Sequence, residues 1–368
     1  MIAINRESAI SVAVAGALLA FVIPLIIVMW PSGSKSLPSG DAEYVKGTIL
    51  SVDDALCEKW TDSEVFCGDA QIKVKGAEPI SMGVDRSGWA SGLEPGDKVI
   101  ARGQVLGEGQ VSWSFHSIDR QIPLFIMVAV SLIIVALAVG LKGAKAFLSM
   151  SASAAFIWTF MVSGVQQGGN PVQYAVVTAI ALLVLVLHVT HGFTLKTTSA
   201  LVGTLIGVGF SALAGWGFSS MLGVTGINDT TSDYALVVGS IDITSLTMAA
   251  LLIALIGILN DITVAQASTV WSLGSHIPEF RKLFRRSVDV GKDHASSAIY
   301  TVAFSIVGTS IVALVIAKSY GMPIDALIQD ESIIIVTVQA MAGIVGLAVT
   351  MPATTLVAAK IRSVVGNG

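Results

Sequence analysis

The sequence predicts an α-helical polytopic membrane bundle of about eight transmembrane helices, with a small extracytoplasmic all-β domain between the first and second helices. The 368 residues are 54% hydrophobic and only 12% charged, and the mean hydropathy is +0.79. An average soluble domain carries about a quarter charged residues, so a soluble globular protein is excluded. Long apolar runs recur along most of the chain, but residues 31–121 have short alternating patterns instead.

Eight apolar stretches are long enough, or nearly so, to cross a hydrocarbon core of about 30 Å, which takes about 20 helical residues. The stretches cover residues 9–30, 122–141, 146–163, 172–190, 198–221, 240–262, 295–317 and 332–357. We expect the first to be an uncleaved anchor, because its apolar core is longer than that of a signal peptide and no small-residue cleavage site follows. The predicted domains are the anchor at 1–30, the β domain at 31–121 and a seven-helix domain at 122–368.

The orientation follows from the Lys and Arg residues, which are retained on the cytoplasmic side of short loops. With the N-terminus inside, eleven of the 21 Lys and Arg residues lie in cytoplasmic segments, and one lies in a short outer loop. The other nine lie in the 31–121 domain, to which the rule does not apply. We therefore expect a bacterial plasma membrane protein with both termini in the cytoplasm and the β domain outside.

The 31–121 domain contains strand-like segments of alternating side chains bounded by turn residues. These segments cover residues 44–50, 70–75, 98–102 and 111–115. About five short strands in a domain of this size predict a small barrel that resembles an OB-fold. This outline hosts so many functions that it selects none.

Cys57 and Cys67 are the two cysteines of the chain, and both fall in the predicted outer domain. An oxidising compartment favours a structural disulfide, which would stabilise the domain by about 2–3 kcal/mol. A redox-active pair is the alternative, although the spacing is not the C-x-x-C arrangement that lowers a thiol pKa. Two cysteines are too few for a zinc ribbon or an iron–sulfur site.

Ionisable residues inside apolar segments are candidates for an ion or substrate pathway, because they are costly at bilayer depth unless paired or hydrated. Asp242 and Asp261 lie at the two ends of the sixth stretch, and Asn260 precedes the second of them. One interpretation places each acid at a membrane interface. The alternative is a sixth helix broken near Gly257 or Asn260–Asp261, where unwound backbone would line a cavity.

His188, His191 and Asp293 are the other candidates for this pathway. The two histidines are three residues apart and share one face of a predicted helix, where they could ligate a metal or relay protons. Two ligands do not make a metal site, so histidines that cap backbone carbonyls are the alternative. Asp293 precedes an apolar run and could cap that helix.

Basic and apolar residues alternate before the seventh stretch, where Arg281, Lys282, Arg285 and Arg286 surround Leu283 and Phe284. This pattern is typical of an amphipathic helix whose cations contact anionic lipid headgroups. A freely solvated linker is the alternative.

The sequence contains no phosphate-binding loop, no H-E-x-x-H and no G-x-S-x-G motif. We therefore expect no enzymatic activity, no cofactor and no metal site. The formal net charge of −4 and the absence of basic blocks argue against nucleic-acid binding.

The second half of the chain resembles the YibE/F family of bacterial multi-pass membrane proteins over about residues 120–320. The motifs that carry the resemblance are Thr190-His191-Gly192-Phe193, Leu201-Val202-Gly203-Thr204-Leu205, Gly239-Ser240-Ile241-Asp242, Asn260-Asp261 and Ser287-Val288-Asp289-Val290-Gly291-Lys292-Asp293. The resemblance implies a helical bundle that often follows an N-terminal anchor and a small outer domain, and a presumed permease.

The leading functional hypothesis is a transporter of a small solute or ion, coupled to protons or cations through Asp261 and Asp242. The rival hypothesis is an envelope assembly or signalling protein whose outer domain binds a partner. The expected partners are the lipid bilayer and the transported solute or ion. A homo-oligomer, or a second membrane subunit that completes the pore, is a further alternative.

Overall fold

The computed structural model describes residues 6–32, 42–53, 57, 66–105, 110–228 and 241–365. The chain divides into two compact units, which are described separately below. One comprises Met1–Leu37 and Val139–Gly368, and the other comprises Pro38–Ala138.

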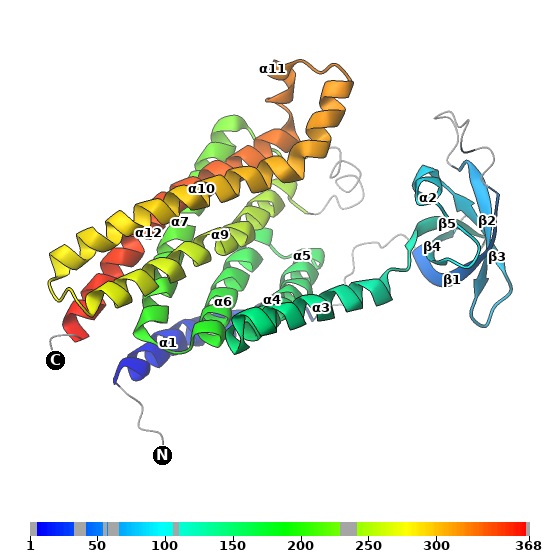
Figure 1. Ribbon diagram of the computed structural model, residues 1–368. Coiled ribbons are helices and arrows are strands. Elements are labelled where there is room, and N and C mark those ends of the chain that lie inside the picture. Colours follow the sequence, from blue (N-terminus) through cyan, green and yellow to red (C-terminus); the bar gives the residue numbers. More distant parts are fainter. Residues whose placement is uncertain are drawn as a thin grey trace. The chain divides into compact units, whose positions relative to one another are not determined.

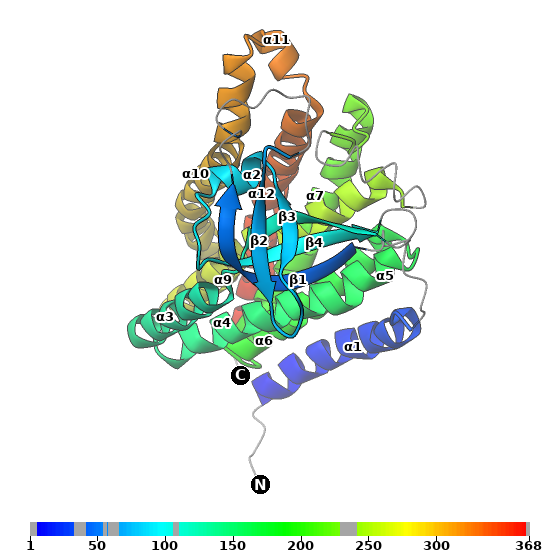
Figure 2. The same ribbon diagram turned by 90° about the vertical axis from the view of Figure 1, so that its right-hand side faces the viewer.

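The smaller unit is built on a closed barrel, as the sequence predicts. The described strands are β1 (Ala42–Asp53), β2 (Gly68–Val74), β3 (Ile80–Val84), β4 (Lys98–Val105) and β5 (Val111–Ile118). They are hydrogen-bonded in the order β1-β2-β3-β5-β4, and all neighbours are antiparallel except β3 and β5. Figure 2 shows the strands curving around one interior. Alternate side chains fill that interior, including Ile49, Ile72, Met82, Val99 and Phe115.

A disulfide joins Cys57 to Cys67, so the predicted pairing is confirmed. The short helix α2 (Arg86–Ala90) begins after Asp85, whose carboxylate caps it by accepting a hydrogen bond from the Gly88 N–H. Helix α3 (Gln121–Val139) follows β5. At its start, Asp119 accepts hydrogen bonds from the Gln121 N–H and the Lys46 ammonium, and both lower the pKa of the Asp119 carboxyl.

The larger unit is a helical bundle. Its helices are α1 (Arg6–Met29), α4 (Leu141–Phe156), α5 (Ser163–Gln166), α6 (Pro171–His191), α7 (Leu195–Leu222), α9 (Ile243–Gly274), α10 (Phe280–Ser319), α11 (Ile324–Leu327) and α12 (Glu331–Val365), with a π-helical segment η3 (Ile157–Val162) between α4 and α5. Helices α7, α9, α10 and α12 lie side by side, and α1 begins at the end of the bundle where α12 finishes (Figure 1).

Eight described helical segments are long and apolar enough to cross a membrane, which fits a multi-pass membrane protein. The first is part of the bundle, because α1 packs against α6 and α7. The Tyr174 hydroxyl donates to the Met29 carbonyl at 2.6 Å, and the Thr198 hydroxyl donates to Ser11 Oγ at 2.8 Å. The third span runs over Leu141–Gln166 and is longer than predicted.

The sixth span differs most from the sequence interpretation. Helix α9 is continuous from Ile243 to Gly274, so the predicted alternative of a helix broken near Gly257 or Asn260–Asp261 is wrong. A glycine inside a helix costs only about 1 kcal/mol relative to alanine, and a continuous helix satisfies its own backbone groups in lipid. The buried side chains of Leu255, Leu259 and Ile262 anchor the helix on both sides of the expected break.

Helix α10 also starts earlier than predicted, at Phe280 instead of residue 295. The basic segment at 281–286 therefore forms the first turns of a 40-residue helix, and the interpretation as a freely solvated linker is wrong. Leu283 of this segment is buried, whereas Arg281, Lys282, Arg285 and Arg286 are exposed.

The closest helix contact in the bundle joins α7 to α12 through small residues. Gly203 lies against Thr354, Gly207 against Thr350, and Gly346 against Ser211. A Cβ atom added to any of these three glycines would overlap the hydroxyl that faces it. Small residues at a spacing of four allow transmembrane helices to approach closely and gain packing energy.

We expect Gly207→Leu to prevent native packing of α7 against α12, because the new side chain has no space beside Thr350. Gly209→Leu is the matched control, since nothing lies within 4 Å of a Cβ at that position. The measurement is the unfolding temperature of the detergent-purified protein. Gly207→Leu should lower it strongly, by a destabilisation of about 1–3 kcal/mol or more. Equal unfolding temperatures for the two variants would contradict this account of the interface.

Candidate functional site

Asp261 lies inside the span of α9. The helix has 32 residues, so at a rise of 1.5 Å per residue Asp261 is about 27 Å from its first residue and about 20 Å from its last. A hydrocarbon core is about 30 Å thick, so α9 is longer than the core, and Asp261 lies near the middle of this candidate span. Helix α9 begins directly after Asp242 and continues past Asp261 to Gly274, and the interpretation that these two acids mark the membrane interfaces stays a prediction.

The Asp261 side chain lines a cleft of about 540 Å³ between α9, α10 and α12. The other polar residues of the lining are Thr301, Ser305 and Thr309 of α10 and Gln339 of α12. The Asp261 carboxylate makes no hydrogen bond or ion pair with any residue that the structure describes. Gly257 lies one turn before Asp261, and a Cβ there would meet nothing within 4 Å.

The polar lining of the cleft presents mainly oxygen atoms. Thr301 and Thr309 donate their hydroxyl protons to the carbonyls of Ser297 and Ser305 within α10, at 3.2 and 3.1 Å. Their oxygen lone pairs therefore remain available as acceptors. A carboxylate with hydroxyl and amide oxygens is a ligand set that suits a proton, a hydrated cation or a hard metal cation.

A buried polar cluster lies beyond Asp261, about 7.5 Å further along α9. Gln266 Nε2 donates to the Ser287 carbonyl of α10 and to Thr355 Oγ1 of α12, both at 2.7 Å. Gln266, Ser287 and Thr355 are fully buried, and Gln266 Oε1 has no hydrogen-bond partner among the described residues. This cluster joins three helices and fills the bundle below the cleft.

The sequence interpretation missed Gln266 because it considered only ionisable groups in the apolar stretches. Gln266 also lies outside the sixth stretch, which was predicted to end at residue 262. The signal that was present is a lone glutamine within 38 polar-poor residues, since a neutral amide in a membrane span also needs a partner.

Asn260 is partly buried, and its Oδ1 atom has no hydrogen-bond partner among the described residues. Asp242 is the N-cap residue of α9 and accepts hydrogen bonds from the Ser245 hydroxyl and the Thr244 N–H. The Ser245 hydroxyl, with backbone N–H groups of Ser245 and Thr244, lowers the pKa of the Asp242 carboxyl. A carboxyl with a lowered pKa stays ionised near neutral pH, which suits a helix cap better than a proton carrier.

The two histidines of α6 lie away from the cleft. His188 is buried, and its Nδ1 lies 2.9 Å from the Val184 carbonyl, as the interpretation of carbonyl capping predicts. His191 is exposed and lines a small cavity with Lys196, Thr197 and Val264. Neither histidine lines the cleft that holds Asp261.

Asp293 is an exposed residue inside α10, and it does not line the cleft. The interpretation of Asp293 as a helix cap is wrong, because α10 begins at Phe280. Within the described ranges, no group of three His, Cys, Asp or Glu side chains is placed to hold a metal ion.

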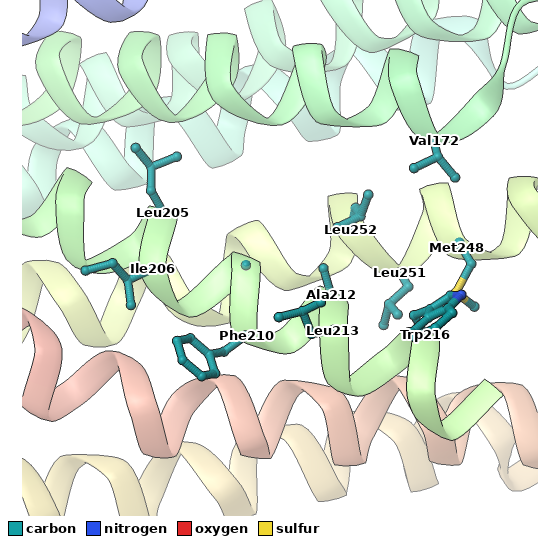
Figure 3. Close-up of a pocket in the computed structure, with 11 residues that line it drawn as sticks. Val172, Leu205, Ile206, Phe210, Ala212, Leu213, Trp216, Met248, Leu251 and Leu252 are labelled. Carbon is teal, nitrogen blue, oxygen red and sulfur yellow. The ribbon is translucent and has the colours of Figure 1, made fainter. Parts of the chain in front are cut away.

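A second pocket, of about 660 Å³, lies between α6, α7 and α9 and is almost entirely apolar. Figure 3 shows Leu205, Ile206, Phe210, Leu213 and Trp216 along one helix, facing residues of two others. Val172, Met248, Leu251 and Leu252 complete most of the lining. These side chains offer no ligands for an ion, so this pocket suits a hydrocarbon group and not a charged one.

Comparison with known proteins identifies the family. The family model described as YibE/F-like protein matches residues 126–363, which is more than half of the chain and includes α6, α7, α9, α10 and almost all of α12. No curated protein and no solved structure matches the chain. The match covers Asp261, Gln266 and every residue that lines the cleft between α9, α10 and α12. Because the match extends over more than half of its length, the chain belongs to the YibE/F-like protein family.

Proposed function

We propose that this protein transports a small solute or ion across the bacterial plasma membrane, with Asp261 as the group that couples transport to protons or cations. One observation carries the proposal. The Asp261 carboxylate, near the middle of a candidate membrane span, lines a cleft and has no partner among the described residues. An ionised aspartate at mid-bilayer costs about 2.5–3.5 kcal/mol even on insertion scales, so this group needs water, a bound cation or a proton.

The position of the cleft along α9 supports alternating access. The cleft is lined by α9 residues from Leu251 to Asp261, and the buried Gln266 cluster lies on the other side of Asp261. In this state an ion or proton could reach Asp261 through the cleft, and the Gln266 cluster would block its way to the opposite end of the bundle. Movement of α10 relative to α9 and α12 would break the hydrogen bond from Gln266 to the Ser287 carbonyl and open the second path.

The proposed orientation places both termini in the cytoplasm and the barrel outside. The distribution of Lys and Arg in short loops supports this orientation. The Cys57–Cys67 disulfide also supports it, because disulfides persist on the oxidising side of a bacterial membrane. In this orientation the cleft, which extends from Asp261 toward the Asp242 end of α9, lies in the outer half of the bilayer.

Asp261→Asn removes the titratable group while keeping the shape of the side chain. We expect it to abolish pH-gradient-driven or cation-gradient-driven flux in proteoliposomes. The control is Asp242→Asn, which weakens a helix cap by about 1 kcal/mol or less and should leave most of the flux. The measurement is the rate of proton or cation movement, together with the amount of folded protein. Unchanged flux in Asp261→Asn would remove the coupling role.

Gly257→Trp tests the cleft itself without altering Asp261. A Cβ atom at Gly257 would meet no atom within 4 Å and Gly257 lines the cleft, so we expect the variant to fold with its indole in the cleft. Gly308→Trp is the matched control, because a Cβ there also meets nothing and Gly308 does not line the cleft. We expect at least a tenfold loss of flux only in Gly257→Trp. Comparable flux in the two variants would show that this cleft is not the pathway.

A partner-binding role for the barrel is the second candidate function, because the barrel forms a unit with its own buried core and disulfide. Replacing residues 42–118 with a flexible linker separates the two candidates. Transport through the bundle predicts that flux is retained after membrane insertion. Loss of the cellular phenotype with intact insertion and flux would favour the partner-binding role instead.

A further inference from the structure

A small cavity of about 190 Å³ lies at the end of the bundle where α9 finishes and α10 begins. The turn between these helices, including Pro278, forms one wall, and the last turns of α12 form another. Arg362 of α12 lines the cavity together with Ser275 and Ser363. The cavity is therefore at the opposite end of α9 from Asp242 and is separate from the cleft that holds Asp261.

The aliphatic part of the Arg362 side chain packs against Gly274. A Cβ added to Gly274 would lie 2.7 Å from Arg362 Cγ and 3.2 Å from Arg362 Nε, so the glycine makes room for the arginine. The Nε atom is buried and has no hydrogen-bond partner among the residues placed by the structure. The structure describes no hydrogen bond or ion pair for any other atom of Arg362. A guanidinium does not lose its proton in proteins, so this charge lacks a counter-ion within the part of the chain that the structure describes.

The surroundings of the cavity are strongly basic. The first turns of α10 carry Arg281, Lys282, Arg285 and Arg286, and α12 carries Lys360, whose Nζ lies 5.9 Å from the centre of the Phe280 ring. Among the described residues, none of these cations lies within 4.0 Å of a carboxylate. Glu279, the acid in this turn, is the N-cap residue of α10, and its side chain makes no capping hydrogen bond.

The two serine hydroxyls of the cavity have no free proton to donate to an anion. Ser275 Oγ donates to the Ser272 carbonyl and Ser363 Oγ donates to the Lys360 carbonyl, at 2.7 and 2.9 Å. Arg362 thus supplies the free donors of the cavity. The N-terminal end of the 40-residue helix α10 adds the positive end of its dipole beside Pro278.

We infer that this cavity binds a phosphate group through Arg362. The planar guanidinium fork matches two phosphate oxygens, and the exposed cations around the cavity add only a diffuse, solvent-screened attraction. The source is either the phosphodiester of an anionic phospholipid or free inorganic phosphate. The cavity would bind a single phosphate group at a defined position. This differs from the diffuse contact with many lipid headgroups that is predicted for the exposed basic residues 281–286. The inference does not depend on the proposed transport.

The test uses the full-length protein purified in a neutral detergent. Its unfolding temperature is measured during titration with inorganic phosphate, with short-chain phosphatidylglycerol and with short-chain phosphatidylcholine. We expect saturable stabilisation by at least one of the first two ligands. Arg362→Gln should weaken the apparent affinity about tenfold or more, as for loss of a charge-assisted hydrogen bond. Arg286→Gln, which removes the same charge from an exposed position, should change it by about twofold or less.

Comparing the titrations with inorganic phosphate and with phosphatidylglycerol shows whether the bound phosphate group is a free anion or a lipid headgroup. Stabilisation by phosphatidylglycerol without inorganic phosphate assigns the site to a lipid headgroup, and stabilisation by inorganic phosphate alone shows that the free anion suffices. Equal effects of Arg362→Gln and Arg286→Gln would overturn the inference, as would the lack of saturable binding to either ligand. If Arg362→Gln does not fold, Arg362→Lys keeps the charge but removes the fork, and wild-type affinity in that variant would overturn the inference.

Discussion

The close contact of α7 with α12 is the constraint on which the rest of the bundle depends. In lipid there is no hydrophobic force between helices, so packing of small residues and a few hydrogen bonds must hold the spans together. Gly203, Gly207 and Gly346 bring the two backbones close enough that no side chain larger than a hydroxyl fits between them. Helix α9 then packs against both partners, and Thr263 meets Thr204 of α7 at 2.7 Å.

Because α7 and α12 contact each other so closely, no ion or solute pathway can run between them. The polar cleft lies instead where α10 meets α9 and α12, and α10 has few buried residues, namely Leu283, Ser287, Gly291, Val302 and Ala317. A helix with so little buried surface is the element that can move at least cost. The Gln266 hydrogen bond to the Ser287 carbonyl connects α10 to α9, and the Gln266 hydrogen bond to Thr355 joins α9 to α12.

Much of the architecture followed from the sequence, because lipid imposes a simple requirement on it. Each span had to be a long apolar helix, so all eight were predicted, although α9 and α10 extend well beyond the predicted stretches at 240–262 and 295–317. Alternation identified four of the five strands, and β3 was missed because Ile80–Val84 is short and contains a glycine. The disulfide was predicted because the chain has two cysteines and both fall in the domain that we expect to lie outside the membrane.

The candidate site was only partly predictable. The sequence by itself determined that Asp261 lies in an apolar segment and needs a partner, because that depends on local composition alone. Only the tertiary structure decided that α9 stays unbroken, that Asp261 faces hydroxyls of α10 and that Gln266 closes the space beyond it. Which helices meet, and through which faces, depends on side-chain volumes at contacts such as Gly207 with Thr350, between residues far apart in the chain.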